Sequence, residues 1–177
     1  FPEKRVRYIS LLDGIDTGVE SSANDITPFR AIMNDMYARD ISKKIKSAKR
    51  QRAKQGLFIG SQTPYGYRID PDQKGVLIVD PEAAEAVRLI FQLAADGLGS
   101  VAIADELQAR KIISPSAYKY LNGDQRFAHY TAVKSGDYYV WCSTTISQIL
   151  SNKVYTGQLV SLKTESTSYK IRQRISV

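Results

Sequence analysis

The segment YARDISKKIKSAKRQRAKQG, Tyr37–Gly56, changes character near its middle. Its first part mixes apolar and polar residues, whereas Lys43 to Lys54 contains seven Lys or Arg among twelve residues and no Asp or Glu. On a helix these basic side chains surround nearly the whole circumference. Buried unpaired charges cost several kcal/mol each, so this part must lie in water or against an anion.

One long helix is predicted to carry this segment. Thr27 supplies a hydroxyl N-cap, Pro28 suits the first helical position, and nothing breaks the pattern before Gly56. The helix, residues 27–56, is expected to span about 29 residues and roughly 43 Å. Its first half carries an apolar stripe that is typical of packing against protein. The stripe consists of Phe29, Met33, Tyr37, Ile41 and Ile45, flanked by Ile32 and Met36.

The composition limits the class of protein. The chain has 177 residues, of which 43% are hydrophobic and 24% charged, as in soluble globular proteins. No apolar run approaches the roughly 18 residues of a membrane span. The net charge of +7, concentrated in residues 43–54, favours a polyanionic partner, with nucleic acid first and an anionic membrane second. A merely solvated basic helix is the alternative, but such helices usually interleave Glu with Lys.

The chain has one cysteine, Cys142, and one histidine, His129. A single thiol forms no disulfide within the chain, which fits a reducing compartment, and no Cys/His cluster exists to bind zinc. We interpret Cys142, beside Trp141, as a packed thiol rather than a nucleophile. His129 lies in a polar, Tyr-rich stretch without an evident partner.

The remaining patterns predict a mainly α fold with small β elements (α+β). In chain order they are a strand at residues 5–12, a polar loop at 13–25, a hairpin that turns at 72–75, a helix from Asp80-Pro81 to Gly97–Gly99, a helix capped by Ser100, an irregular insert at 114–140, and a helix from Ser143 to Asn152. Inward positions are predicted for Val87, Ile90, Phe91, Ala94, Ile103, Ala104, Leu107, Ile146, Ile149 and Leu150.

The three later helices suggest a helix-turn-helix arrangement. The last of them presents small hydrogen-bonding side chains and no acid, as suits a reader of the DNA major groove. Such faces are also common on ordinary surface helices, and the insert before this helix departs from the compact motif. Tyr65 and Tyr67, in the turn PYGY, either anchor that turn or stack on bases.

Five motifs in order resemble the large serine recombinases of the resolvase/invertase superfamily, specifically the transposon-borne kind. They are RVRYISLLDGIDT, NDMYARDISKKIKSAKRQRAKQG, GSQTPYGY, DPEAAEAVRLIFQLAADGLGSVAIADELQARKI and WCSTTISQILSNKVYTGQLV. The resemblance implies a remnant of the catalytic domain at 1–26, a connecting helix at 27–56, a DNA-binding domain at 57–162 and the start of a linker at 163–177. Because the chain begins at Phe1, we expect a piece of a longer enzyme whose nucleophilic serine lies upstream, so that this piece is inactive alone.

The resemblance also implies partners and cofactors. We expect binding to double-stranded DNA at an attachment site, self-association to a dimer or tetramer in the full-length protein, no membrane contact, and a bacterial cytoplasmic, nucleoid-associated location. No cofactor is expected in this piece, and zinc is expected in a missing C-terminal domain. Relatives carry Glu-Arg where this chain has Lys43-Lys44, so either Arg39 or Lys44 is a candidate to support the active site.

The residues expected to contact DNA lie in three groups. They are Lys43, Lys46, Lys49, Arg50, Arg52 and Lys54 on the long helix, Tyr65, Tyr67 and Arg68 in the turn and hairpin, and Thr144, Thr145, Ser147, Gln148 and Lys153 on or after the last helix. Two alternatives stay open. One is a non-enzymatic helix-turn-helix regulator, and the other is an RNA or ribosome binder that uses the basic helix as an electrostatic arm.

Overall fold

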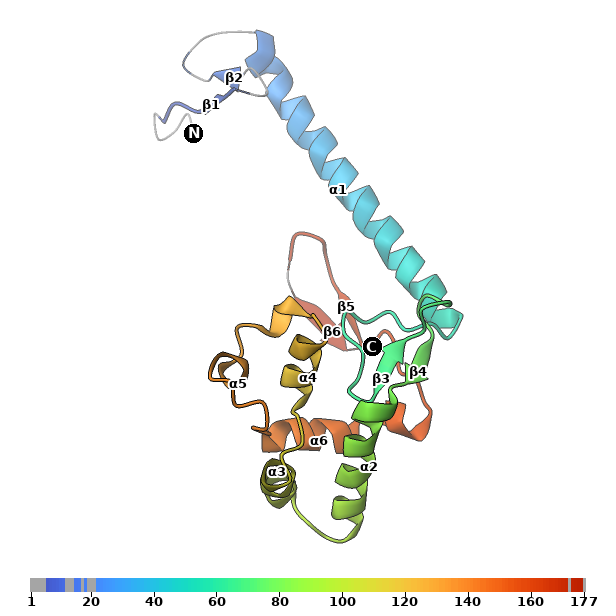
Figure 1. Ribbon diagram of the computed structural model, residues 1–177. Helices are drawn as coiled ribbons and strands as arrows, with labels where there is room; N and C mark the ends of the chain where they lie inside the picture. Colours follow the sequence, from blue (N-terminus) through green and yellow to red (C-terminus); the bar gives the residue numbers. More distant parts are fainter. Residues whose placement is uncertain (1–5, 12–14, 17, 19–21, 172, 177) are drawn as a thin grey trace. The chain divides into compact units, whose positions relative to one another are not determined.

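A computed structural model of the chain describes residues 6–11, 15, 16, 18, 22–171 and 173–176 (Figure 1). The chain divides into two compact units, residues 1–51 with 162–177, and residues 52–161. Helices dominate, and the strands form three antiparallel pairs, so the predicted mainly α fold with small β elements is confirmed.

The first unit contains most of the long helix α1 (Ser22–Lys54), which is 33 residues in length and ends in the second unit. It begins before the predicted N-cap, inside the predicted polar loop, so the predicted start at Thr27 is wrong. Pro28 lies within the helix, which continues across it at the cost of about one backbone hydrogen bond. The predicted C-terminal end is confirmed, because Gly56 (φ +73°) adopts the left-handed conformation and Leu57 N–H donates to the Arg52 carbonyl at 3.1 Å.

Two short strand pairs complete this unit. β1 (Ile9–Ser10) pairs with β2 (Ile15–Asp16), so the predicted strand at 5–12 is shorter in the described residues, and the predicted polar loop contains a strand. Arg7 Nε donates to Asp16 Oδ1 at 2.8 Å and ties the two segments together. β5 (Thr164–Ser166) pairs with β6 (Arg174–Ser176), in a stretch where no strand was predicted.

The second unit is built on the hairpin of β3 (Tyr67–Ile69) and β4 (Leu77–Val79), followed by α2 (Pro81–Ala95) and α3 (Ser100–Ala109). The predicted hairpin is confirmed, and so is the start of α2 at Pro81. Ser100 is the first residue of α3 rather than its cap, because Gly99 occupies the N-cap position. The Ser100 hydroxyl instead hydrogen-bonds Ser147 at 3.0 Å.

The core forms where α2, α3 and α6 (Ser143–Ser151) pack together (Figure 1). Its most buried large side chains are Ile90, Ile103, Leu107 and Ile146, all predicted to point inward. Phe91, Ala94 and Leu150 are partly buried against them. Trp141 closes one side, where its indole N–H donates to the Ile112 carbonyl at 2.8 Å. The helix periodicities of the sequence therefore identified this core correctly.

The insert between α3 and α6 is not irregular, as the sequence had suggested. It contains α4 (Pro115–Leu121), the 3-10 turn η2 (Gln125–Phe127) and α5 (Thr131–Lys134). Ala117, Phe127 and Val133 are buried, so each of these short elements contributes one buried apolar side chain. That tertiary packing stabilises helices too short to form alone.

Candidate nucleic-acid interface

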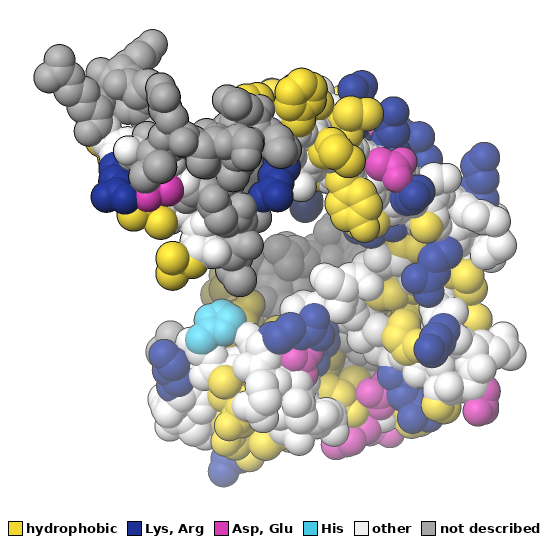
Figure 2. Space-filling view, turned by 90° about the horizontal axis from the view of Figure 1, so that it is seen from above, with side chains coloured by type: hydrophobic (Ala, Val, Ile, Leu, Met, Phe, Trp, Pro, Cys, Tyr) yellow, Lys and Arg dark blue, Asp and Glu magenta, His cyan; other side chains and the backbone are white. Residues whose placement is uncertain are grey.

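The C-terminal half of α1 forms a basic surface, defined here as Lys43, Lys44, Lys46, Lys49, Arg50, Arg52 and Lys54. All seven side chains are exposed except Lys46, which is half-buried. Figure 2 shows Lys and Arg side chains gathered beyond a row of apolar side chains. The apolar stripe of α1 is also exposed, with Phe29 at 68% and Tyr37 at 70%. The predicted change of character is thus visible as two adjacent surfaces of one helix.

Within the first unit, the β5–β6 segment supplies an anion to this basic surface. Arg50 Nη2 lies 2.7 Å from Glu165 Oε1, and Lys46 Nζ lies 3.8 Å from the same oxygen. Lys46 also donates to the Ser166 carbonyl at 2.7 Å. Two of the predicted DNA-contacting residues therefore already have partners in the chain. The sequence offered no signal for this contact, since Glu165 lies 115 residues from Arg50.

A second contact joins β5–β6 to α1 about four helical turns away. Lys170 Nζ lies 2.7 Å from Asp35 Oδ1, and the Tyr169 hydroxyl donates to the same carboxylate. The hydrogen bond from Lys170, with that from Tyr169, lowers the pKa of Asp35. β5 and β6 lie in the stretch 163–177 that was predicted as the start of a linker, and two contacts hold this strand pair and its described connection against the helix.

The two candidate supporting bases lie in different surroundings. Lys44 is paired with Asp40 one turn earlier, at 2.8 Å, and that carboxylate raises the pKa of Lys44. Arg39 is exposed on the same helix. Which of them supports an active site stays a prediction.

The predicted reading face lies on α6. Thr144, Ser147 and Gln148 are exposed and Thr145 is half-buried. Cys142 is exposed, so the interpretation of this residue as a packed thiol is wrong. The Thr144 hydroxyl contacts the Cys142 thiol at 2.9 Å, and this hydrogen bond lowers the pKa of Cys142. Ser147 contacts Ser100 as described above. Within the described part of the chain, the Gln148 amide makes no hydrogen bond, so its donors and acceptor remain available.

The two tyrosines of the PYGY turn pack inside the second unit. Tyr65 is buried, its hydroxyl donates to the Ile113 carbonyl at 3.2 Å, and its ring meets Trp141 edge to face. Burial raises the pKa of Tyr65 far above its usual value. The half-buried Tyr67 donates to the Val154 carbonyl at 3.4 Å. The burial of Tyr65 leaves almost none of its ring to stack on a base, so of the two sequence interpretations we keep the turn anchor for this residue. Arg68 and Lys153 are exposed.

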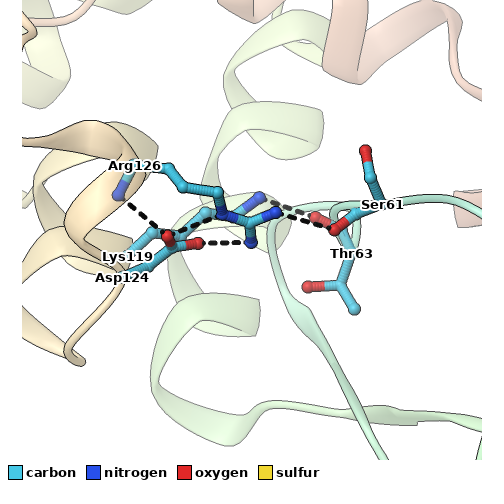
Figure 3. A network of polar contacts seen from close by, with 5 residues as sticks. All are labelled: Ser61, Thr63, Lys119, Asp124 and Arg126. Atoms are coloured by element: carbon cyan, nitrogen blue, oxygen red, sulfur yellow. Dashed lines mark hydrogen bonds and ion pairs between the residues drawn. The ribbon is translucent and has the colours of Figure 1, made fainter. Parts of the chain in front are cut away.

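A groove of about 500 Å³ lies beside this turn, between residues 61–69 and α4–η2. Figure 3 shows the polar network along it. Lys119 Nζ donates to the Thr63 carbonyl at 2.7 Å, and Arg126 Nη1 to the Ser61 carbonyl at 3.3 Å. Arg126 also forms a two-pronged ion pair with Asp124, at 2.7 and 2.8 Å. Neither Lys119 nor Arg126 was predicted as a site residue, because each is an isolated base in a stretch without periodic pattern.

Among residues 6–11, 15, 16, 18, 22–171 and 173–176, no group of three or more His, Cys, Asp or Glu side chains could hold a metal ion. No helix within these residues is both long enough and apolar enough to cross a membrane.

The model of the Recombinase family matches residues 81–176, which include α2, α3, α6 and the β5–β6 pair. No solved structure matches the chain. The match confirms the resemblance at the level of this domain, which is found in large serine recombinases. It covers more than half of the 177 residues, and the chain therefore belongs to the Recombinase family.

Proposed function

We propose that this chain is the DNA-binding portion of a serine site-specific recombinase of the large, transposon-borne kind. The observation that carries the proposal is the basic surface of α1: residues 43–54 contain seven bases and no acid, and among the described residues the carboxylates of Asp40 and Glu165 pair with only three of the seven. Seven like charges on one helical segment repel one another unless an anion lies against them. Duplex DNA, with one negative charge per roughly 1.7 Å of its axis, is the polyanion that suits such a row.

In the proposed complex, the basic surface positions the DNA and α6 reads its sequence. Lys and Arg contacts to phosphates carry affinity without sequence information. Gln148 on the exposed face of α6 can make two hydrogen bonds to one adenine in the major groove. Thr144, Thr145 and Ser147 add short hydroxyl donors and acceptors beside it.

The chemistry of the intact enzyme follows the resemblance to serine recombinases. A serine would attack a phosphodiester and form a phosphoserine ester with one DNA end, while the other end leaves as a free hydroxyl. After exchange, a free DNA hydroxyl would attack the ester, rejoin the strands and release the serine. The proposal gives this chain the task of binding and assigns none of its serines as nucleophile. The apolar stripe of α1 is proposed to pack between subunits in a dimer or tetramer, and zinc is proposed for a separate C-terminal domain.

The test is the salt dependence of binding to a random-sequence DNA duplex, measured by fluorescence anisotropy with the whole chain. About five phosphate contacts from α1 give a slope of log affinity against log salt near −4 to −5. Structured RNA of equal charge serves as the competitor. Binding that is insensitive to salt would contradict the role of α1, and preferential displacement by RNA would favour the RNA-binding alternative.

A further inference from the structure

We propose that the groove between residues 61–69 and α4–η2 binds one phosphate group of the DNA backbone, with Lys119 as its principal ligand. This inference rests on the proposed function, because it names a further contact to the same DNA. The groove lies wholly within the second unit, at a distance in sequence from the basic surface of α1.

The first argument concerns the charge on Lys119. Its ammonium group is partly buried, and burial is the main cause that lowers the pKa of Lys119; nearby Arg126 lowers it further, while Asp124 opposes both. The only hydrogen bond of this ammonium in the described residues goes to the neutral Thr63 carbonyl, and no carboxylate lies within ion-pair distance of it there. A partly desolvated cation without a paired anion is destabilised, and an incoming anion would relieve that cost.

The second argument concerns position. The Thr63 carbonyl and the Phe127 ring, whose centroid lies 5.5 Å from Lys119 Nζ, hold the ammonium in place. An ammonium group has three N–H donors, so two remain for a ligand in the groove. The charge is therefore placed before any ligand arrives, which reduces the ordering cost of binding.

The third argument concerns the surrounding charges. Three cations line the groove, Arg68, Lys119 and Arg126, against two carboxylates, Asp80 and Asp124. Both carboxylates already have partners. Asp124 accepts two hydrogen bonds from the Arg126 guanidinium, and Asp80 accepts one from the Tyr118 hydroxyl at 3.0 Å. Because the Tyr118 hydroxyl is neutral, Asp80 keeps its negative charge, and the three cations and two carboxylates give the groove a net charge of +1.

The fourth argument concerns the kind of anion. The groove is open and lined by polar groups, including Gln62 and Asn122 beside the three cations. A phosphate diester presents two non-bridging oxygens that share one negative charge, and it is held between neighbouring sugars, so it needs a site that is open at its sides. Lys119 reaches it as a point charge, as lysines commonly do at phosphates.

The experiment uses two matched pairs of variants of the whole chain, with a random-sequence DNA duplex at several salt concentrations. Lys119→Gln is compared with Lys74→Gln, an exposed lysine in the β3–β4 turn outside the groove. We expect Lys119→Gln to weaken binding several-fold and to reduce the salt slope by about one, with Lys74→Gln unchanged and Lys119→Arg restoring the slope. Equal effects of Lys119→Gln and Lys74→Gln would overturn the inference.

A second pair covers the case in which Lys119→Gln fails to fold. Gln62→Glu places a negative charge at the groove without touching the Lys119 hydrogen bond, and Gln73→Glu places one on the exposed turn. Each substitution adds one negative charge, which weakens DNA binding slightly in both variants. We expect a further loss of affinity only in Gln62→Glu. Equal weakening by both would count against the groove.

Inorganic phosphate separates the failure of this inference from the failure of the proposed function. At constant ionic strength, added phosphate should shift the backbone amide resonances of residues 61–63, 65 and 66 in the wild-type chain and not in Lys119→Gln. If duplex binding proves insensitive to salt, the proposed function fails, and this titration still decides whether the groove takes a phosphate oxyanion. Identical spectra with phosphate and with chloride would overturn the inference.

Discussion

Arg50 on α1 and Glu165 on β5 form an ion pair with a nitrogen–oxygen distance of 2.7 Å. Both side chains are partly exposed, so the pair contributes little to folding stability, about 0–1 kcal/mol. Its importance lies in competition, because Arg50 is one of the residues proposed to bind DNA. An acid of the same chain occupies a place proposed for a phosphate.

The first prediction is that Glu165→Gln increases the affinity for DNA, because it frees Arg50 and Lys46 from a competing carboxylate. We expect a several-fold gain in anisotropy titrations at low salt, which shrinks as salt is raised. Glu106→Gln is the matched control, since Glu106 forms a 2.7 Å ion pair with Arg110 and is exposed to a similar degree. The same gain in both variants would mean that only net charge had been changed.

The second prediction separates positioning from reading. Arg50→Ala should weaken binding to all DNA sequences alike, whereas Gln148→Ala should lose about 1–3 kcal/mol of preference at one base pair. The measurement is selection of bound sequences from a randomised duplex pool, repeated for each variant. Identical sequence preferences in the two variants would refute the division of labour between α1 and α6.

The third prediction concerns the core of the second unit. Ile146 on α6 is fully buried, so Ile146→Ala should lower the free energy of unfolding by about 2–5 kcal/mol. Val101→Ala on α3 is the control, because Val101 is 65% exposed and should change stability by less than about 0.5 kcal/mol. Urea denaturation followed by circular dichroism measures both. Similar midpoints for the two variants would place Ile146 outside the core.

The fourth prediction concerns the pH dependence of the contact between α1 and the β5–β6 segment. Because the folded-state pKa of Asp35 is lowered, its contribution to stability is present above the ordinary Asp value of about 3.9. It is lost as the pH falls through the lower, folded-state value. Carboxyl-carbon NMR of Asp35 should therefore show a midpoint below about 3.9.

The control for this titration is a pair of lysine variants. Lys170→Gln should raise the midpoint of Asp35, since it removes the hydrogen bond that contributes most to the shift. Lys163→Gln removes the same charge from an exposed residue that precedes Lys170 by seven positions in the sequence. This variant should leave the midpoint of Asp35 unchanged. A midpoint that does not respond to Lys170→Gln would show that the contact is absent in solution.

Local patterns predicted much of the second unit. The hairpin turns at Gly75, whose φ of +91° favours glycine, and α2 begins with Pro81 at its first position. Both features follow from the conformations of single residues and need no knowledge of the rest of the chain. The buried faces of α3 and α6 also followed from apolar spacing.

The elements that were missed depend on contacts between distant residues. Ser114-Pro115 was a usable start signal for α4, but seven residues are too few to show a helical period. The ion pairs Arg50–Glu165 and Asp35–Lys170 hold the β5–β6 segment against α1. The partners in each pair lie far apart in the sequence, and only folding brings them together. The role of Tyr65 was equally open, since a tyrosine beside a turn can point inward or outward until its neighbours are known.

Because α1 is unbroken, the number of residues between two of its side chains determines the angle between them around the helix axis. Each residue advances the helix by about 1.5 Å and turns it by about 100°. One residue inserted between Ile45 and Lys46 would rotate the apolar stripe by more than a quarter turn relative to Arg50. Seven inserted residues would rotate it by only about 20° the other way. The number of residues in α1 therefore sets the angle between the apolar stripe and the basic surface around the helix axis.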